Sequence, residues 1–166
     1  MEESLDQKRS GSTSLVVSQL VMEESLDQKR NGWMTLVIAL LLFVITVGVY
    51  ARVLEKGFSF LLFDDHLYVT RNAHVQKGLS GDNILWAFDL KTFVAANWHP
   101  LTLISHMADC DLFGVEPGEG LWGLGPRGHH LTNVLLHATN TVLLFLVLFW
   151  YTGSRWASAL VAALFG

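Results

Sequence analysis

The sequence predicts an all-α integral membrane protein, and three observations lead to this fold class. Of the 166 residues, 51% are hydrophobic and only 16% are charged, which is too apolar for an ordinary soluble domain. Two long segments, 33–51 and 130–151, contain no Asp, Glu, Lys or Arg. Each is long enough to cross the roughly 30 Å hydrocarbon core as a helix that rises about 1.5 Å per residue. A third apolar segment, 156–166, reads as the start of a truncated third membrane helix.

The first apolar segment also fits a secretory signal peptide. Lys29 and Arg30 supply a basic start, and Val49-Tyr50-Ala51 matches a small-x-small cleavage site. The apolar run is longer than the roughly 7–15 residues of a signal-peptide core. An uncleaved transmembrane helix is therefore the simpler interpretation.

Residues 1–32 form a polar tail that contains a duplication. The sequence MEESLDQKR occurs at 1–9 and again at 22–30. Chance does not produce an identity of this length, and no repeat architecture has two copies at this offset and none later. We interpret the duplication as a tandem copy at the start of the gene or as an expression artefact.

Basic residues near the helix ends predict the orientation of the chain. Lys29 and Arg30 precede the first membrane helix and Arg155 follows the second, which places both of these ends in the cytoplasm. Residues 52–129 then form an outer loop. The loop is periplasmic if the membrane is a bacterial inner membrane, which we expect, and luminal in a eukaryote.

Charge and cysteine content exclude two classes of protein. The net charge is −4 and no extended basic stretch occurs, so nucleic acid is not an expected partner. The single cysteine, Cys110, excludes an internal disulfide.

The outer loop predicts two helices that lie at the membrane interface. The first runs over about 82–95 and is capped by Asp82. Its apolar side consists of Trp86, Leu90, Phe93 and Val94, and an amphipathic helix of this kind lies in the interface. The second runs over about 100–113, because Pro100 suits a first helical position and Gly114 suits a C-terminal cap.

Asp64, Asp65 and His66 follow the first membrane helix closely. An unpaired carboxylate beside a bilayer has to stay hydrated, pair with a cation or bind a metal, because burial of the charge costs several kcal/mol. One of two neighbouring carboxylates can act as general base on an acceptor hydroxyl while the other orients it. They can also bind a divalent cation, Mg²⁺ or Mn²⁺, that neutralises a phosphate leaving group. A solvated turn is the alternative.

Two polar stripes have helical spacing. The stripe on the second membrane helix consists of His130, Asn133, His137 and Asn140. Such a face turns to a cavity or to the interior of a bundle, or forms hydrogen bonds between helices. The stripe on the second loop helix consists of His99, Thr102, His106 and Asp109. It could hold zinc, or haem between helices, although histidines near an interface serve more often as hydrogen-bonding anchors.

Three blocks carry a resemblance to a known family: FDDHLYVTRNAHVQKGLS, NWHPLTLISHMADCDLFG and GHHLTNVLLHATNTVLLFLVL. Together they resemble the N-terminal part of bacterial polytopic membrane proteins that carry tetratricopeptide repeats after the membrane domain. These proteins are similar to the transmembrane and tetratricopeptide repeat-containing O-mannosyltransferases. The resemblance covers about 33–166 and implies the N-terminal part of a C-type glycosyltransferase (GT-C) helical bundle. The first outer loop of that fold bears two juxtamembrane helices and an acidic catalytic motif.

The resemblance implies an enzyme that moves a sugar from a polyprenyl-phosphate donor to a protein or glycan acceptor on the outer face of the membrane. Asp64 and Asp65 match the acidic motif, and one of them would act as base on the acceptor hydroxyl in an inverting displacement. If a metal is bound, these two aspartates are its expected ligands. On position and chemistry we expect the donor phosphate and sugar near His99, His106, His129, His130 and Trp98, although Trp98 also suits the headgroup layer.

The chain departs from the family in two respects. The glycine-rich loop GEGLWGLGPRG is longer than the family usually has, which shifts the following histidines relative to the aspartates. Most of the membrane helices and all of the repeats of a family member would come after Gly166. We therefore expect an N-terminal fragment that is inactive alone. The alternative function is a non-catalytic membrane anchor or assembly module in which the polar stripes pair helices.

Overall fold

The computed structural model describes residues 31–55 and 57–166, and the regular elements within these ranges are helices, with no strand among them. The predicted all-α class is confirmed at this level. Nearly all of the predicted polar tail lies outside the described residues, and so does the duplicated MEESLDQKR sequence.

Two helices are long and apolar enough to cross a membrane, as the sequence predicts. They are Asn31–Leu54, which ends in a 3₁₀ turn, η1 (Ala51–Leu54), and α5 (Pro126–Thr152). The α5 helix begins before the predicted 130, because Pro126 is preorganised for the first turn of a helix. It ends at Gly153, whose φ of 67° is the left-handed conformation common at helix C-termini.

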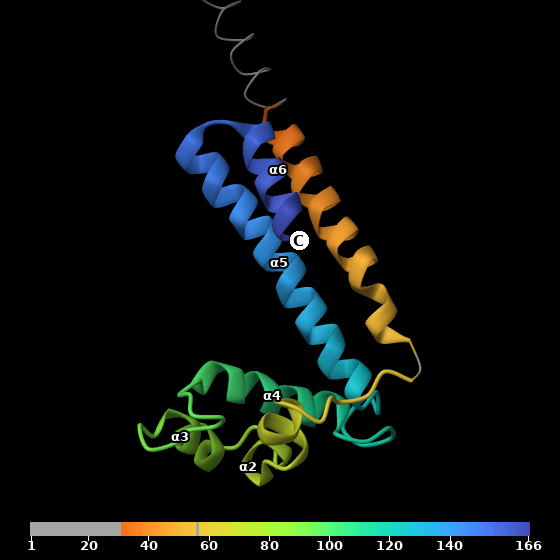
Figure 1. Cartoon of the computed structure of the whole chain (residues 1–166), viewed down its shortest axis with the longest axis vertical. Helices are drawn as coiled ribbons and strands as arrows, with labels where there is room; N and C mark the ends of the chain where they lie inside the picture. Colours follow the sequence, from red (N-terminus) through yellow and green to blue (C-terminus); the bar gives the residue numbers. More distant parts are fainter. Residues whose placement is uncertain (1–30, 56) are drawn as a thin grey trace, which may run out of the picture.

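The third apolar segment forms α6 (Arg155–Phe165), which lies between the two long helices (Figure 1). Its Arg155 donates a hydrogen bond to the carbonyl of Asn31 at 3.3 Å and places its guanidinium 5.3 Å from the centre of the Phe149 ring. The three helices share an apolar core that contains Ala39, Leu42, Phe145 and Ala162. These contacts bring the start of the first long helix and the end of α5 to the same end of the described structure.

The segment between the long helices folds into a compact unit, here called the head (residues 57–125). It contains one π-helical turn, η2 (His66–Thr70), followed by α2 (Ala73–Gln76), α3 (Gly81–Phe88) and α4 (Pro100–Phe113). In Figure 1, α4 lies across the end of α5, and α2 and α3 lie on the other side of α4. The core of the head consists of Val69, Val75, Ala87, Leu103, Met107 and Cys110. The loop is folded, as predicted.

The α3 helix is shorter than the predicted 82–95, and Ser80 rather than Asp82 caps it. The Ser80 hydroxyl accepts the backbone N–H of Asn83 at 3.2 Å. The helix ends at Phe88 because side chains then take over the backbone hydrogen bonds. Asp89 accepts the N–H of Lys91 at 3.0 Å, and the Thr92 hydroxyl donates to the carbonyl of Trp86 at 2.7 Å.

The early end of α3 also changes the predicted apolar side. Trp86 and Val94 are partly buried against the core of the head. Leu90 and Phe93 follow the helix and are 73% and 62% exposed. The prediction that all four residues form one helical stripe is therefore wrong.

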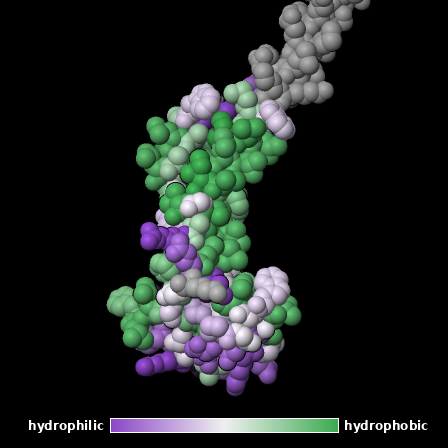
Figure 2. Space-filling model, turned by 90° about the vertical axis from the view of Figure 1, so that its right-hand side faces the viewer, coloured by the Kyte–Doolittle hydropathy of each residue, from purple (hydrophilic) through white to green (hydrophobic). Residues whose placement is uncertain are grey.

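The predicted second loop helix is confirmed as α4, which begins at Pro100 and is followed by Gly114. Figure 2 shows apolar side chains along the membrane helices and polar side chains over much of the head. Within the described residues, the head is thus more polar than the two long helices.

Candidate functional site

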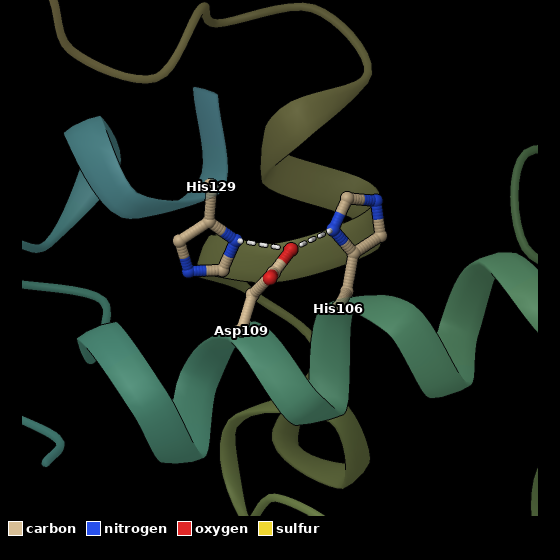
Figure 3. A group of neighbouring side chains, drawn as sticks. All are labelled: His106, Asp109 and His129. Carbon is tan, nitrogen blue, oxygen red and sulfur yellow. Dashed lines mark ion pairs between the residues drawn. The ribbon is translucent and has the colours of Figure 1, made fainter. Parts of the chain in front are cut away.

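A cluster of two histidines and one aspartate lies where α4 meets the start of α5. Asp109 lies between the two imidazoles (Figure 3), with its Oδ2 atom 3.9 Å from Nδ1 of His106 and 3.7 Å from Nδ1 of His129. The side chains of His106, Asp109 and His129 are 19%, 4% and 2% exposed. A polar group of this kind needs partners within the protein, because burial removes it from water.

Local sequence features bring the three side chains together. His106 and Asp109 are one helical turn apart on α4 and share a face. His129 comes from α5, whose first turn approaches α4 closely because Gly128 has no side chain: a Cβ atom there would collide with the ring of Phe113. Gly114 has a φ of 73°, which reverses the chain after α4.

Hydrogen bonds around the cluster orient its members. Nε2 of His129 lies 3.2 Å from the carbonyl oxygen of Gly114, which can only accept, so this nitrogen carries a proton and donates. In a neutral imidazole the other nitrogen, Nδ1, then presents a lone pair toward Asp109. The hydroxyl of Thr132 donates to Oδ1 of Asp109 at 2.6 Å.

Three polar atoms at the centre of the cluster point toward one another without a hydrogen bond. They are Nδ1 of His106, Nδ1 of His129 and Oδ2 of Asp109, all buried and without a hydrogen-bond partner in the described part of the chain. Buried polar atoms are normally satisfied. A proton or a cation between these atoms would satisfy them.

Burial shifts the titration of the two α4 residues. It raises the pKa of Asp109 to about 6, although the hydrogen bond from Thr132 opposes the shift. Burial lowers the pKa of His106, and the negative charge of Asp65 opposes this shift. Both directions follow from the cost of holding charge away from water.

Of the two aspartates of the predicted motif, Asp65 is the one whose charge acts on the histidines of this cluster. It is partly buried, its Oδ2 accepts the backbone N–H of Leu61 at 2.8 Å, and it lies close enough to His106 and His129 to act on their charge. Asp64 is exposed. The backbone carbonyl of Asp64 accepts the N–H groups of Leu67 and Tyr68 at 2.9 and 3.1 Å, which starts η2.

His130 lies beside the cluster and lines a separate cavity. The cavity measures about 340 Å³ and lies between the first membrane helix and α5. Its walls are Tyr50, Val53, His130, Asn133, Val134 and His137. The ring of Phe60 connects the two sites, with its centre 5.0 Å from that of His129 and 6.4 Å from that of His130.

The polar stripe predicted on the second membrane helix is therefore divided. Its first three members line the cavity: His130, Asn133 and His137. Asn140 is exposed and is not among the lining residues.

Two of the predicted substrate-binding residues lie apart from the cluster. His99 is exposed just before α4, and Trp98 is 42% exposed. The ring of Tyr68 lies between the histidines, with its centre 6.3 Å from those of His99 and His106. The polar stripe on α4 thus contributes His106 and Asp109 to the cluster, while its first two members remain outside.

Within the described residues, the group of three possible metal ligands that lie close together is His106, Asp109 and His129. Asp64 and Asp65 are not part of it. The hard cations Mg²⁺ and Mn²⁺ prefer several oxygen ligands. Two carboxylates supply only part of such a ligand set, and a cation bound by Asp64 and Asp65 stays a prediction.

Sequence reasoning missed two residues of the site and one contact. Phe60 and Tyr68 reach the histidines only through the folding of the head, and their spacing gives no signal of it. The pairing of His129 with Asp109 joins two helices across the glycine-rich loop, so helical periodicity could not reveal it. The sequence shows that Gly128 directly precedes His129. The role of this glycine, however, depends on its contact with Phe113, which the sequence does not reveal.

Searches with protein-family models, against curated proteins and against solved structures each find no match to this chain.

Proposed function

We propose that the chain is the acid-bearing N-terminal part of a membrane glycosyltransferase that uses a polyprenyl-phosphate sugar as donor, with Asp65 as the catalytic base. The observation that carries the proposal is the position of Asp65. Its carboxylate accepts the backbone N–H of Leu61 at 2.8 Å, and its charge acts on His106 and His129. The three sequence blocks that resemble this family add support.

The geometry of Asp65 suits proton abstraction. One carboxylate oxygen, Oδ2, is fixed by the backbone, which leaves the other free to accept a hydrogen bond from an acceptor hydroxyl. A base must come within hydrogen-bond reach of the proton that it takes. The acceptor oxygen then attacks the anomeric carbon, the bond from that carbon to the phosphate oxygen breaks, and polyprenyl phosphate leaves while Asp65 keeps the proton. Asp64 anchors η2 through its backbone and is exposed.

The cavity beside His130 suits the donor phosphate. Its volume of about 340 Å³ lies within the roughly 300–1,000 Å³ of small-molecule sites. The Nε2 atoms of His130 and His137 are buried without a hydrogen-bond partner in the described residues. Both can donate hydrogen bonds to phosphate oxygens when they carry a proton.

Exposed apolar residues next to the aspartates suit a lipid-anchored substrate. Leu61, Leu62 and Phe63 are 71%, 91% and 76% exposed, directly before Asp64. Apolar side chains of this exposure are stabilised by contact with lipid at the membrane surface. The reacting phosphate of the donor lies at headgroup depth, so a base beside this segment meets it there. On this proposal the head lies on the outer face of the membrane, and the fold is the N-terminal part of a GT-C bundle.

A membrane assembly module is the second candidate function, and one observation favours it. Asn133 and Asn140 are exposed on α5, within the apolar span. Amide side chains in a bilayer pair with other helices, because lipid offers them no partner. Such an assembly would depend on these two asparagines, and no sugar transfer would depend on Asp65.

The test compares Asp65→Asn with the matched variant Asp64→Asn, each in the longest natural form of the protein. Membranes that contain equal amounts of each protein are given polyprenyl-phosphate [³H]mannose or [³H]glucose, and label in protein and glycan is counted. We expect Asp65→Asn to transfer at least about 100-fold less label than the unaltered protein, because a general base accelerates a reaction by about 100-fold or more. Asp64→Asn should retain most of the transfer. Undiminished transfer by Asp65→Asn, or no transfer by the unaltered protein with either donor, overturns the proposal.

A further inference from the structure

We propose that His106, Asp109 and His129 bind one Zn²⁺ ion, which fastens α4 to the start of α5 and keeps one coordination position open. The inference is independent of the proposed transferase activity. It depends on the geometry of the cluster in Figure 3.

The distances between the ligand atoms are close to those of a zinc site. One ligand atom from each residue lies within 4.8 Å of the others, and the two distances to Oδ2 of Asp109 are 3.7 and 3.9 Å. Tetrahedral zinc with bonds of about 2.0–2.1 Å separates its ligand atoms by about 3.3 Å. The two distances to Asp109 exceed this value by about half an ångström, and the separation of the two histidine ligand atoms exceeds it by at most about 1.5 Å. Rotation of the side chains has to close these differences for all three atoms to bind one ion.

The lone pairs of the cluster face the position that the ion would take. The hydrogen bond to Gly114 fixes the proton of His129 on Nε2, so the lone pair of Nδ1 points toward Asp109. The Nδ1 atom of His106 and Oδ2 of Asp109 face the same position. These three buried polar atoms converge without a hydrogen-bond partner in the described residues, and a divalent cation bound by their lone pairs would satisfy all three.

Outer contacts orient the ligands as they do in known zinc sites. A metal-binding histidine usually donates its other ring N–H to a carbonyl or carboxylate, and a ligating carboxylate is itself hydrogen-bonded. His129 donates to the carbonyl of Gly114 at 3.2 Å. Thr132 donates to Oδ1 of Asp109 at 2.6 Å, which leaves Oδ2 for the ion.

The donor set and its surroundings favour zinc over other divalent cations. Two imidazoles and one carboxylate suit a borderline cation better than Mg²⁺ or Ca²⁺. Iron in oxygenases uses the same donor set but needs more open positions. Here the rings of Phe60 and Phe113 lie with their centres 5.0 and 6.5 Å from that of His129, and the ring of Tyr68 lies 6.3 Å from that of His106. This crowding favours the low coordination number of zinc.

The ion would join two elements that are otherwise connected by a glycine-rich loop. Two ligands come from α4 and one from α5, so metal binding fixes the head on the membrane helix. Asp65 is outside the ligand group but lies near both imidazoles. Three protein ligands leave the fourth tetrahedral position of the ion to water.

The test measures zinc on the full chain, purified in detergent with a tag that contains no histidine. The protein is stripped with a chelator and dialysed against Zn²⁺, and the bound metal is counted by mass spectrometry. Competition with a chromophoric chelator then gives the dissociation constant. We expect about one Zn²⁺ per chain, and the ligand-field bands of tetrahedral Co²⁺ when cobalt replaces zinc.

Four variants make the assignment specific. His106→Ala and Asp109→Asn should weaken zinc binding by at least about 100-fold, while His99→Ala, a histidine outside the cluster, should not change it. Thr132→Val keeps all three ligands and removes only the outer hydrogen bond, so about tenfold weaker binding is expected. Far-UV circular dichroism reports whether each variant is folded, and Thr132→Val keeps the test valid if the ligand variants are not.

The results that overturn the proposal are equally specific. They are no bound zinc in the unaltered chain, equal binding by His106→Ala or by Thr132→Val, or tighter binding of Fe²⁺ or Mg²⁺ than of Zn²⁺. None of these results bears on sugar transfer by Asp65, so failure of the zinc site and failure of the transferase proposal are distinguishable.

Discussion

The Nε2 atom of His129 donates a hydrogen bond of 3.2 Å to the carbonyl of Gly114, which ties the first turn of α5 to the end of α4. This one contact fixes which nitrogen of His129 faces Asp109. It also holds the head against the membrane helix that lines the cavity. The candidate site therefore depends on how closely the two helices approach.

Gly128→Ala tests that approach. A methyl group at this position collides with the ring of Phe113, and overpacking of this kind costs about 1–3 kcal/mol. We expect a lower midpoint of thermal unfolding in detergent. Gly48→Ala is the control, because a Cβ atom there meets no atom of the described chain within 4 Å. An unchanged midpoint for Gly128→Ala would show that the helices do not pack as described.

Ala96→Gly should stabilise the head. Ala95 and Ala96 have φ values of 48° and 63° in the turn before α4, and the left-handed conformation costs an L-residue roughly 1–2 kcal/mol. Glycine avoids this strain at an entropic cost of about 0.5–1 kcal/mol. The free energy of unfolding in urea should therefore rise. Ala108→Gly, in the interior of α4, should instead lower the free energy of unfolding by about 1 kcal/mol. A loss of stability in both variants would contradict the turn geometry.

Cys110 should react slowly with maleimide near neutral pH while the head is folded. Its side chain is 7% exposed, and burial, with the charges of Asp109, Asp111 and Glu119, raises the pKa of the thiol to about 12. The thiolate is the reactive form, so little of it is present. Leu101→Cys places a second thiol where the side chain is 74% exposed, and mass spectrometry should show one rapid addition. Equal rates at both thiols would contradict the packed core.

His130→Gln tests the cavity as the donor site. Loss of the imidazole should raise the KM for polyprenyl-phosphate sugar by about tenfold, which corresponds to about 1.4 kcal/mol of binding, with little change in kcat. His99→Gln is the matched control, since His99 lies outside the cavity. Equal KM values for the two variants would contradict the proposal that the donor binds in this cavity.

Local features of the sequence predicted much of the secondary structure. Pro100 and Gly114 marked the ends of α4 correctly, because a proline at the first turn and a glycine after the last are determined by the backbone alone. Two uncharged segments identified both long helices for the same reason: length and hydropathy are local. The predicted end of α3 was wrong because hydrophobic periodicity takes no account of hydrogen bonds from side chains to the backbone. The side chains of Asp89 and Thr92 form such bonds and compete with the helix for backbone groups.

The candidate site was predicted only in part, because it is built by tertiary contacts. The spacing of His106 and Asp109 placed them on one face of a helix, and the structure confirms that arrangement. The contribution of His129 depends on the close packing of Gly128 and Phe113. Likewise, Asp64 and Asp65 are equivalent in the sequence, and only the folded head leaves Asp64 exposed and brings the charge of Asp65 near the histidines.

The most direct test of the account is a comparison of kcat and KM for Asp65→Asn with those of the unaltered protein, using a polyprenyl-phosphate sugar as donor. If Asp65 takes the proton of the acceptor, KM for the donor should stay the same while kcat falls by at least about 100-fold. A normal kcat with a raised KM would contradict the account, because Asp65 would then only help to bind the substrate.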